Sequence, residues 1–229
     1  MNRRLMMKKI ICLILLLSAM ISTTRAEDNK TIPTFQPDGN IVSGLKKLSL
    51  DKFGVPHLTV SKHVELLFET HILLDKHYLT PDKMLNAKRQ TNQHYKISTF
   101  SSNFPEINLT FMSELHLQES GKVKMTTLFA IPTGYELKYA VFKIFILPTK
   151  TSAPIIVSGD GKKEELKKVS TKAFKRVFNN IKQITFFPDN PKLRFSLTSN
   201  TPFILQRENG IYYIHLSLKK PCILDIDLN

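Results

Sequence analysis

One stretch decides the fold class: residues 121–148, GKVKMTTLFAIPTGYELKYAVFKIFILP. Apolar and polar side chains alternate from Val123 to Ile131 and again, less regularly, from Lys138 to Leu147. A period of two residues is typical of a half-buried β-strand. Between the two segments, Pro132-Thr133-Gly134 supplies the break that a turn needs. The stretch therefore predicts a hairpin at the centre of an antiparallel sheet.

Further alternating segments surround this hairpin. Residues 62–74 and 107–118 show the same period, and the turn 119–121 would join the second of them to the hairpin as a three-stranded meander, residues 107–147. Shorter strands are predicted nearer the C-terminus, at residues 181–187, 193–197, 203–206, 211–218 and 223–228. Such spacing indicates a mainly β protein, an antiparallel β-sandwich with one or two short helices, one of them beginning near Pro81.

One segment also fits a helix. Its apolar residues recur at spacings of three and four with lysines between them: Leu166, Val169, Ala173, Phe174, Val177, Phe178 and Ile181. That pattern favours an amphipathic basic helix, although the sequence leaves open whether residues 163–180 are helix or strand. Such a helix would cover one face of the sheet with its lysines in water, or alternatively bind a membrane surface or an acidic partner.

The N-terminus resembles a secretory signal. Basic residues precede a short apolar run, 10–21, and small residues before position 27 fit cleavage after Ala26. We therefore predict a signal peptide at 1–26, a flexible leader at 27–40 and a β-sandwich domain at 41–229. The expected location is secreted or periplasmic, with no membrane span after cleavage.

The formal net charge is +14, and the chain stays basic without its signal. A basic surface favours anionic lipids or glycans, and equally fits a solvated exterior with no partner. Export argues against nucleic acid as a partner. Only Cys222 remains after cleavage, so an intrachain disulfide is not expected. Oligomeric state, ligand identity and the exact cleavage site stay open.

Known catalytic motifs are absent from the sequence, so whether the chain is an enzyme stays uncertain, with the balance against it. No cofactor is expected. The best candidate for a metal site is the polar face of the strand 62–74, which carries His63, Glu65, Glu69 and His71. Same-face residues on a strand are about 7 Å apart, so this face is alternatively the solvated side of a half-exposed strand.

Other candidates are weaker. Asp225 and Asp227 share one face of the last strand and would suit calcium or acid–base chemistry, or simply an exposed face. His215 is read as a solvated or hydrogen-bonded histidine. Because the chain has no tryptophan, the predicted glycan-stacking side chains are tyrosines: Tyr135, Tyr139, Tyr212 and Tyr213.

The order of strands and turns resembles the β-sandwich region that precedes the catalytic barrel in large secreted bacterial glycoside hydrolases. The resemblance lies in six segments: 123–129, 145–148, 157–161, 184–186, 203–205 and 213–216. It implies a noncatalytic sandwich beside a barrel, with no catalytic residues to transfer. The chain ends at Asn229, where the barrel would begin, so it either stands alone or is a truncated or split relative.

Together these features predict an exported, noncatalytic β-sandwich module associated with glycan processing. It would act by recognising glycan or by docking to a partner hydrolase. The alternative is a stand-alone exported structural or binding protein that uses a basic face on anionic envelope surfaces. An enzyme whose site is assembled from separate strands remains a third possibility.

Overall fold

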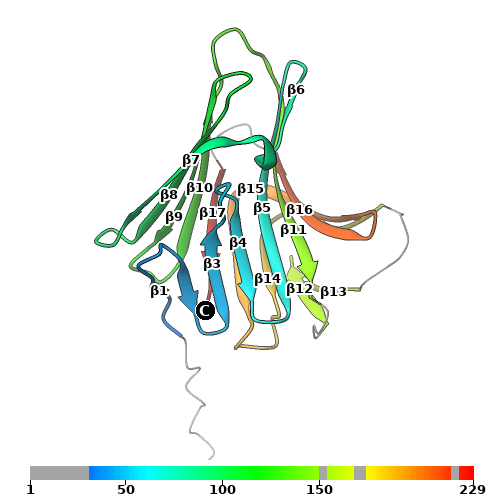
Figure 1. The fold of residues 1–229 in the computed structure, drawn as a ribbon. Coiled ribbons are helices and arrows are strands. Elements are labelled where there is room, and N and C mark those ends of the chain that lie inside the picture. Colours follow the sequence, from blue (N-terminus) through cyan, green and yellow to red (C-terminus); the bar gives the residue numbers. More distant parts are fainter. Residues whose placement is uncertain (1–30, 150–153, 168–173, 218–221) are drawn as a thin grey trace, which may run out of the picture. The chain divides into compact units, whose positions relative to one another are not determined.

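A computed structural model describes residues 31–149, 154–167, 174–217 and 222–229 (Figure 1). The chain divides into two compact units, Met1–Thr31 and Ile32–Asn229. The predicted signal peptide and the first residues of the predicted leader lie outside the described residues. No helix in the described part of the chain is both long enough and apolar enough to cross a membrane.

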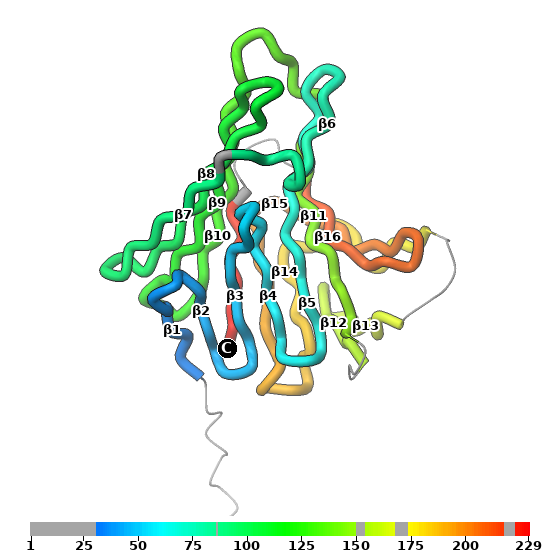
Figure 2. The backbone as a smooth tube through the Cα atoms, viewed as in Figure 1, coloured from blue at the N-terminus to red at the C-terminus, as the bar shows by residue number. Residues whose placement is uncertain are grey.

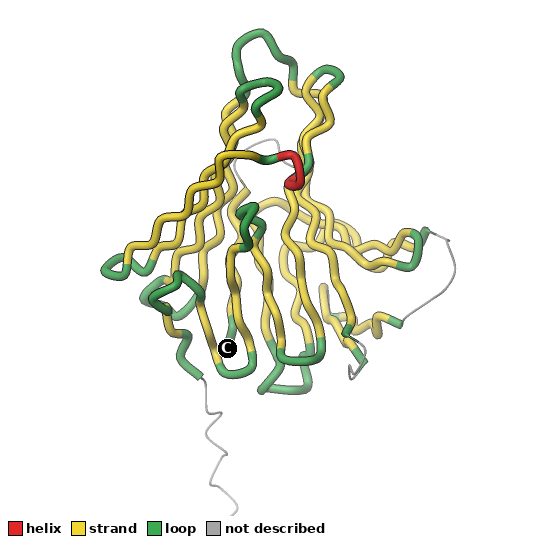
Figure 3. Tube along the Cα trace, in the orientation of Figure 1, coloured by secondary structure: helices red, strands yellow, loops and turns green. Residues whose placement is uncertain are grey.

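Strands make up most of the second unit, which confirms a mainly β fold (Figure 3). Its one helical element in the described residues is a 3-10 turn, η1 (Pro81–Lys83), where Pro81 predicts a helix start. The strands are β1 (Thr34–Phe35), β2 (Ile41–Ser43), β3 (Lys46–Leu50), β4 (Pro56–Val60), β5 (Val64–Leu74), β6 (His77–Leu79), β7 (Leu85–Asn92), β8 (Ile97–Phe104), β9 (Leu109–Leu117), β10 (Val123–Ala130), β11 (Leu137–Pro148), β12 (Ile155–Gly159), β13 (Lys162–Leu166), β14 (Lys175–Phe186), β15 (Phe195–Glu208), β16 (Ile211–Ser217) and β17 (Cys222–Asp227).

All the strand pairings are antiparallel, and they form two halves of one curled sheet. In the first half, β1 to β5 pair in sequence order, and β5 continues through β11 and β16 to the end of β15. In the second half, β7, β8, β9 and β10 pair in order, and β10 continues through β17 to the start of β15. The β14–β15 hairpin belongs to both halves, and β14 also carries the β12–β13 hairpin.

The two halves enclose a single hydrophobic core, as a β-sandwich requires. Its largest fully buried side chains are aromatic and come from both halves: Phe68, Phe104, Phe142, Phe186, Phe195 and Phe203. A polar link also joins the halves, because the buried Lys46 Nζ of β3 donates to the Leu228 carbonyl oxygen after β17, at 2.6 Å. Burial, and then the charge of Arg194, lower the pKa of Lys46.

The predicted central hairpin is wrong, although both of its strands exist. Along residues 123–127, β10 is bordered by β9 on one side and β17 on the other. Along residues 141–146, β11 is bordered by β5 and β16. Each strand is already paired on both edges, so residues 131–136 form a crossing between the two halves rather than a hairpin turn (Figure 2).

The helix predicted within residues 163–180 is also wrong where the structure describes the segment. Residues 162–166 form β13 and residues 175–180 begin β14, while residues 168–173 lie outside the described residues. The register of β14 against β15 shifts between Arg176 and Phe178, again before Ile181, and again before Gln183. Each shift offsets the alternation, so Phe178, Ile181 and Ile184 are buried three residues apart, as they would be on a helix.

The break predicted between the strands at 193–197 and 203–206 does not exist. β15 runs without interruption from Phe195 to Glu208, and its partner changes along the way. Ser196 to Ser199 pair with β17, whereas Ile204 to Glu208 pair with β16. One long strand therefore passes from one half of the sheet to the other, where two separate strands were predicted.

Candidate functional site

The outer face of β5, β11 and β16 carries a cluster of polar and aromatic side chains. In β5 the even-numbered residues from Val64 to Leu74 face the core, so the odd-numbered residues lie on the outer face. The registers place Glu69 of β5 opposite Lys143 of β11, and Lys143 opposite His215 of β16. β6 pairs with the C-terminal end of β5, residues 72–74, and so adds to this surface there (Figure 1).

A chain of hydrogen bonds links three of these side chains. His71 Nε2 lies 2.9 Å from Glu69 Oε2, and His71 Nδ1 lies 2.6 Å from the Tyr78 hydroxyl. An ionised carboxylate only accepts, so Nε2–H donates to Glu69, and in that tautomer Nδ1 accepts from the Tyr78 hydroxyl. His71 is buried, which fixes the orientation of Tyr78 above it.

Tyr78 and Tyr139 form an exposed tyrosine pair at this point. Their ring centroids are 6.5 Å apart with an interplanar angle of 43°, and each residue is 40% exposed. Burial, followed by the neighbouring Tyr139 hydroxyl, raises the pKa of Tyr78, so its phenol is protonated at neutral pH. The pair thus presents two aromatic surfaces together with hydroxyl groups.

The aromatic surface continues under the pair and across to β16. The rings of His71 and Phe145 are 6.3 Å apart, and those of Phe145 and Tyr213 are 5.9 Å apart. Lys143 Nζ lies 5.5 Å from the Tyr213 ring centroid, within range of a cation–π interaction. Burial, and then the Lys143 charge, lower the pKa of His215, which keeps that imidazole neutral at pH 7.

Tyr213 is held in place by hydrogen bonds and is buried from solvent. Its hydroxyl accepts a hydrogen bond from Gln206 Nε2 at 2.7 Å and donates to Glu208 Oε2 at 2.7 Å. Burial, and then the Glu208 bond, raise the pKa of Tyr213. Because the residue is 7% exposed, Tyr213 supports the surface and does not present a ring face.

A second polar cluster occupies the same face, on β4. His57 Nδ1 lies 3.0 Å from Glu65 Oε1, and His57 Nε2 lies 3.4 Å from Asp51 Oδ2. The Asp51 bond, and to a smaller degree the Glu65 bond, raise the pKa of His57 despite its partial burial. Burial acts to raise the pKa of Asp51, but bonds from His57 and from backbone N–H groups outweigh it and lower that pKa.

We expect His57 to make stability depend on pH. Its folded-state pKa lies above the unfolded value of about 6.5, so its stabilisation is complete below pH about 6.5 and is lost as the pH rises through the raised pKa. We compare the free energy of unfolding of the parent protein with that of His57→Gln. The advantage of the parent should shrink by about 1 kcal/mol between pH 6 and pH 9. Urea unfolding at both pH values measures it, and a difference that stays constant with pH would contradict the assignment.

The four predicted metal-ligating residues do not come together as one set. Glu69 bonds His71, Glu65 bonds His57, and His63 lies against Phe187 with ring centroids 6.1 Å apart. No group of three or more His, Cys, Asp or Glu among the described residues is arranged to hold a metal ion. The Glu69–His71 pair is therefore better suited to accept and donate hydrogen bonds.

The remaining predicted residues are distributed over different surfaces. Tyr212 is 8% exposed and faces the core, which prevents it from stacking on a sugar at the outer face. Tyr135 is partly buried against the core, with its ring 5.7 Å from that of His77. Asp225 and Asp227 lie on β17 in the other half of the sheet. Of the four predicted tyrosines, Tyr139 is the one that lies exposed within this candidate site.

Tyr78 and His57 were not predicted as site residues. Tyr78 lies in a three-residue strand inside a polar segment, and no periodicity marks it. A partial signal exists, because Asp75 and Lys76 separate the end of β5 from His77-Tyr78-Leu79 like a two-residue hairpin turn. Such a hairpin would have placed Tyr78 opposite Leu73, on the same face as His71.

Comparison with known proteins gives a fold likeness without a family. No family model and no curated protein matches the sequence. Among solved structures, the fold is similar to part of the alpha-N-acetylgalactosaminidase NagBb from Bifidobacterium bifidum, in its GalNAc complex, with a TM-score of 0.57 and 7% sequence identity. The similarity covers 82% of this chain and 35% of that enzyme, so the chain spans about a third of its length. At this identity the likeness shows the fold alone: this chain folds like a portion of that glycoside hydrolase.

Proposed function

We propose that this chain is an exported, noncatalytic β-sandwich module associated with glycan processing, which recognises glycan through the exposed tyrosine pair. The observation that carries the proposal is the pair itself: two tyrosines, each 40% exposed, held over the Glu69–His71 hydrogen bond. Sugar rings present apolar C–H faces that pack on aromatic rings, and hydroxyls that bond to carboxylate and phenol oxygens. The site offers both kinds of group within one surface.

The fold likeness supports the same proposal. The fold is similar to a portion of a glycoside hydrolase, which supports a glycan-related role. We propose that this chain corresponds to a noncatalytic sandwich of the kind that precedes a catalytic barrel, as its order of strands and turns suggests. In that arrangement the module would position glycan for a partner hydrolase, or dock to it. The Glu69–His71–Tyr78 chain then orients the tyrosine ring, because each hydrogen bond removes a rotational freedom that would oppose binding.

Replacing both tyrosines tests the proposal directly. A glycan array with purified residues 27–229 identifies a ligand, and isothermal titration calorimetry then compares the parent with Tyr78→Ala/Tyr139→Ala. We expect at least a 10-fold weaker affinity in the double variant, because exposed aromatic anchors account for much of the binding free energy of such surfaces. Unchanged affinity for the array ligand, or no ligand on the array, would contradict the proposal.

The chain offers a matched control. Tyr95 is 61% exposed in the β7–β8 turn, where its ring packs on His94, so Tyr95→Ala removes an exposed tyrosine from a different surface. That variant should bind glycan like the parent. Salt-sensitive binding to anionic lipid vesicles, equal in the parent and in the double variant, would instead favour the stand-alone basic protein.

A further inference from the structure

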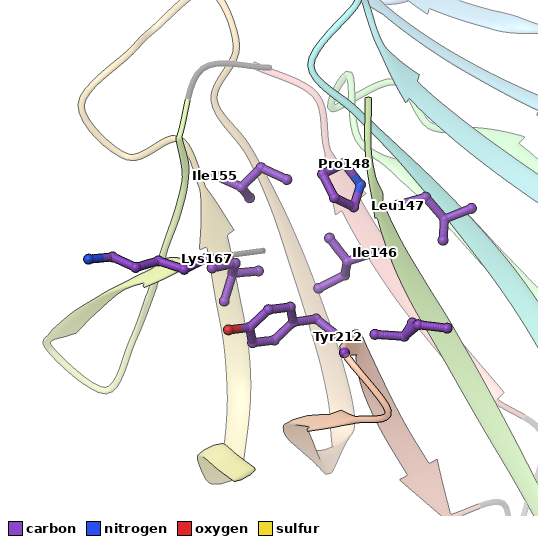
Figure 4. A pocket seen from close by; sticks show the side chains of 9 residues that line it. Ile146, Leu147, Pro148, Ile155, Lys167 and Tyr212 are labelled. Atoms are coloured by element: carbon purple, nitrogen blue, oxygen red, sulfur yellow. The ribbon is translucent and has the colours of Figure 1, made fainter. Parts of the chain in front are cut away.

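An opening lies between β11 and the β12–β13 hairpin. A largely apolar cavity of about 70 Å³ lies there, lined by core-facing side chains such as Ile146, Ile155 and Tyr212 and by more exposed ones such as Pro148 and Ile211. Figure 4 shows Ile146 and Pro148 on one side of the cavity, Ile155 and Lys167 on the other, and the Tyr212 ring between them. This cavity is separate from the tyrosine pair, since Ile146 and Tyr212 lie on the core side of their strands.

A charged hollow of about 410 Å³ adjoins the cavity and shares Lys167 and Tyr212 with it. The register of β14, β15 and β16 places Lys175 opposite Arg207, and Arg207 opposite Tyr212. Glu164 and Glu165 of β13 complete the lining. An apolar cavity thus lies beside a hollow with cationic side chains.

Charges in the hollow are only partly paired. Lys175 Nζ lies 2.6 Å from Glu164 Oε1, and Lys167 Nζ lies 3.9 Å from Glu165 Oε2. Arg207 has no carboxylate oxygen within 4.0 Å among the residues that the structure describes, and its buried Nε makes no hydrogen bond with them. Its guanidinium carbon lies 5.9 Å from the Tyr212 ring centroid. A buried guanidinium N–H without a partner costs free energy that an anion would recover.

We propose that this opening binds a small organic anion that carries a short apolar substituent. The anionic group accepts hydrogen bonds from Arg207, whose planar fork matches a carboxylate, and Lys175 adds a second positive charge. The substituent enters the cavity beside Ile146 and Ile155. A single water needs about 10–15 Å³ of cavity volume measured in the same way. The cavity of 70 Å³ therefore has room for a group of acetyl to short-acyl size.

Four probes separate the parts of this proposal by calorimetry on residues 27–229. N-acetylneuraminate has the charge and the acyl group, glucuronate the charge alone, and N-acetylglucosamine the acyl group alone. Hexanoate joins a carboxylate to an apolar chain without a sugar. We expect N-acetylneuraminate or hexanoate to bind at least 10-fold more tightly than both single-feature probes, and whichever binds tells whether the ligand is an acidic sugar or a fatty carboxylate.

Two variants assign the binding to these residues. Arg207→Gln should weaken the better probe about 10-fold or more, since a charge-assisted bond is lost. Ile211→Gln removes apolar surface from the cavity wall without touching the core, because Ile211 is 44% exposed, and should also weaken it. Lys163→Gln is the control: Lys163 belongs to the same hairpin, bonds Asp189, and lies outside both linings.

The result is independent of the glycan proposal. Tyr78→Ala/Tyr139→Ala should leave anion binding unchanged, and Arg207→Gln should leave binding at the tyrosine pair unchanged. Equal affinity for the charged and uncharged acyl probes, full affinity in Arg207→Gln, or no binding of any probe at millimolar concentration would each overturn the assignment of this opening. Matching melting temperatures for parent and variants confirm that a weakened variant is folded.

Discussion

Phe195→Ala should lower the free energy of unfolding by about 3 to 5 kcal/mol, the range for removing a fully buried phenylalanine ring. Phe195 and Phe186 are both 0% exposed and stack with ring centroids 4.6 Å apart at 6°. They face each other in the β14–β15 register, in the hairpin that belongs to both halves of the sheet. The cavity would therefore form where the two halves join, and neighbouring strands could close it only in part. Urea unfolding followed by circular dichroism measures the loss.

Phe174→Ala is the matched control for this prediction. It removes the same ring from the same chain, but Phe174 is 55% exposed. Its expected cost is about 0.5 kcal/mol or less. A typical domain is stable by only about 5 to 15 kcal/mol, so Phe195→Ala should also shift the melting temperature visibly. Similar costs for the two variants would show that the stacked pair does not hold the hairpin in the core.

The strands were predictable because their signal is local. Residues 62–74 alternate strictly, and β5 (Val64–Leu74) follows that pattern with its even-numbered residues buried. Alternation needs only the knowledge that one face of a strand meets the core. The same reasoning located β9, β10 and β11 within a few residues. Fold class followed from these strands and from the turns between them.

Strand partners were not predictable in this way, because alternation tells which face is buried and not which strand lies beside it. Residues 131–136 contain proline and glycine, as a hairpin turn would, yet they connect β10 and β11 in different halves of the sheet. Both edges of each strand are satisfied by segments distant in sequence. The pairing of β10 with β17, for example, joins Val123 to Ile226.

The bulged strand β14 shows how a local signal can mislead. Phe178, Ile181 and Ile184 are buried at intervals of three, which on a regular strand would put successive residues on opposite faces. The register shifts against β15 restore them to one face, and Asn180 has a positive φ of 57° within this stretch. A strand with repeated bulges therefore imitates the apolar spacing of a helix.

The candidate site depended on the same distant pairings. Glu69 and His71 were recognised together because they lie on one strand, two residues apart. Tyr139 was predicted as one of four glycan-stacking tyrosines, and its partner Tyr78 was not predicted. The two meet because β11 and β6 lie along β5, with Tyr78 and Tyr139 each opposite Leu73. A candidate site spread over three strands becomes visible only when their order is known.

Gly54→Ala should lower the free energy of unfolding by about 2 to 5 kcal/mol, for two separate reasons. Gly54 lies in the β3–β4 loop with φ of +76°, a conformation that costs an L-residue about 1 to 2 kcal/mol. An added Cβ would also overlap the ring of Phe100, which is 2% exposed on β8 in the other half of the sheet. Overpacking of this kind costs about 1 to 3 kcal/mol more. Chemical unfolding in urea gives the combined loss.

Gly134→Ala separates the two causes. Gly134 has φ of +93°, yet an added Cβ there would meet no atom within 4 Å, so this variant carries the backbone cost without the overlap. It should lose about 1 to 2 kcal/mol, less than Gly54→Ala. The difference between the two variants then measures how firmly Phe100 is held between the halves. Equal losses would mean that the Phe100 ring moves aside freely, and that the contact between the β3–β4 loop and β8 contributes little to closing the sandwich.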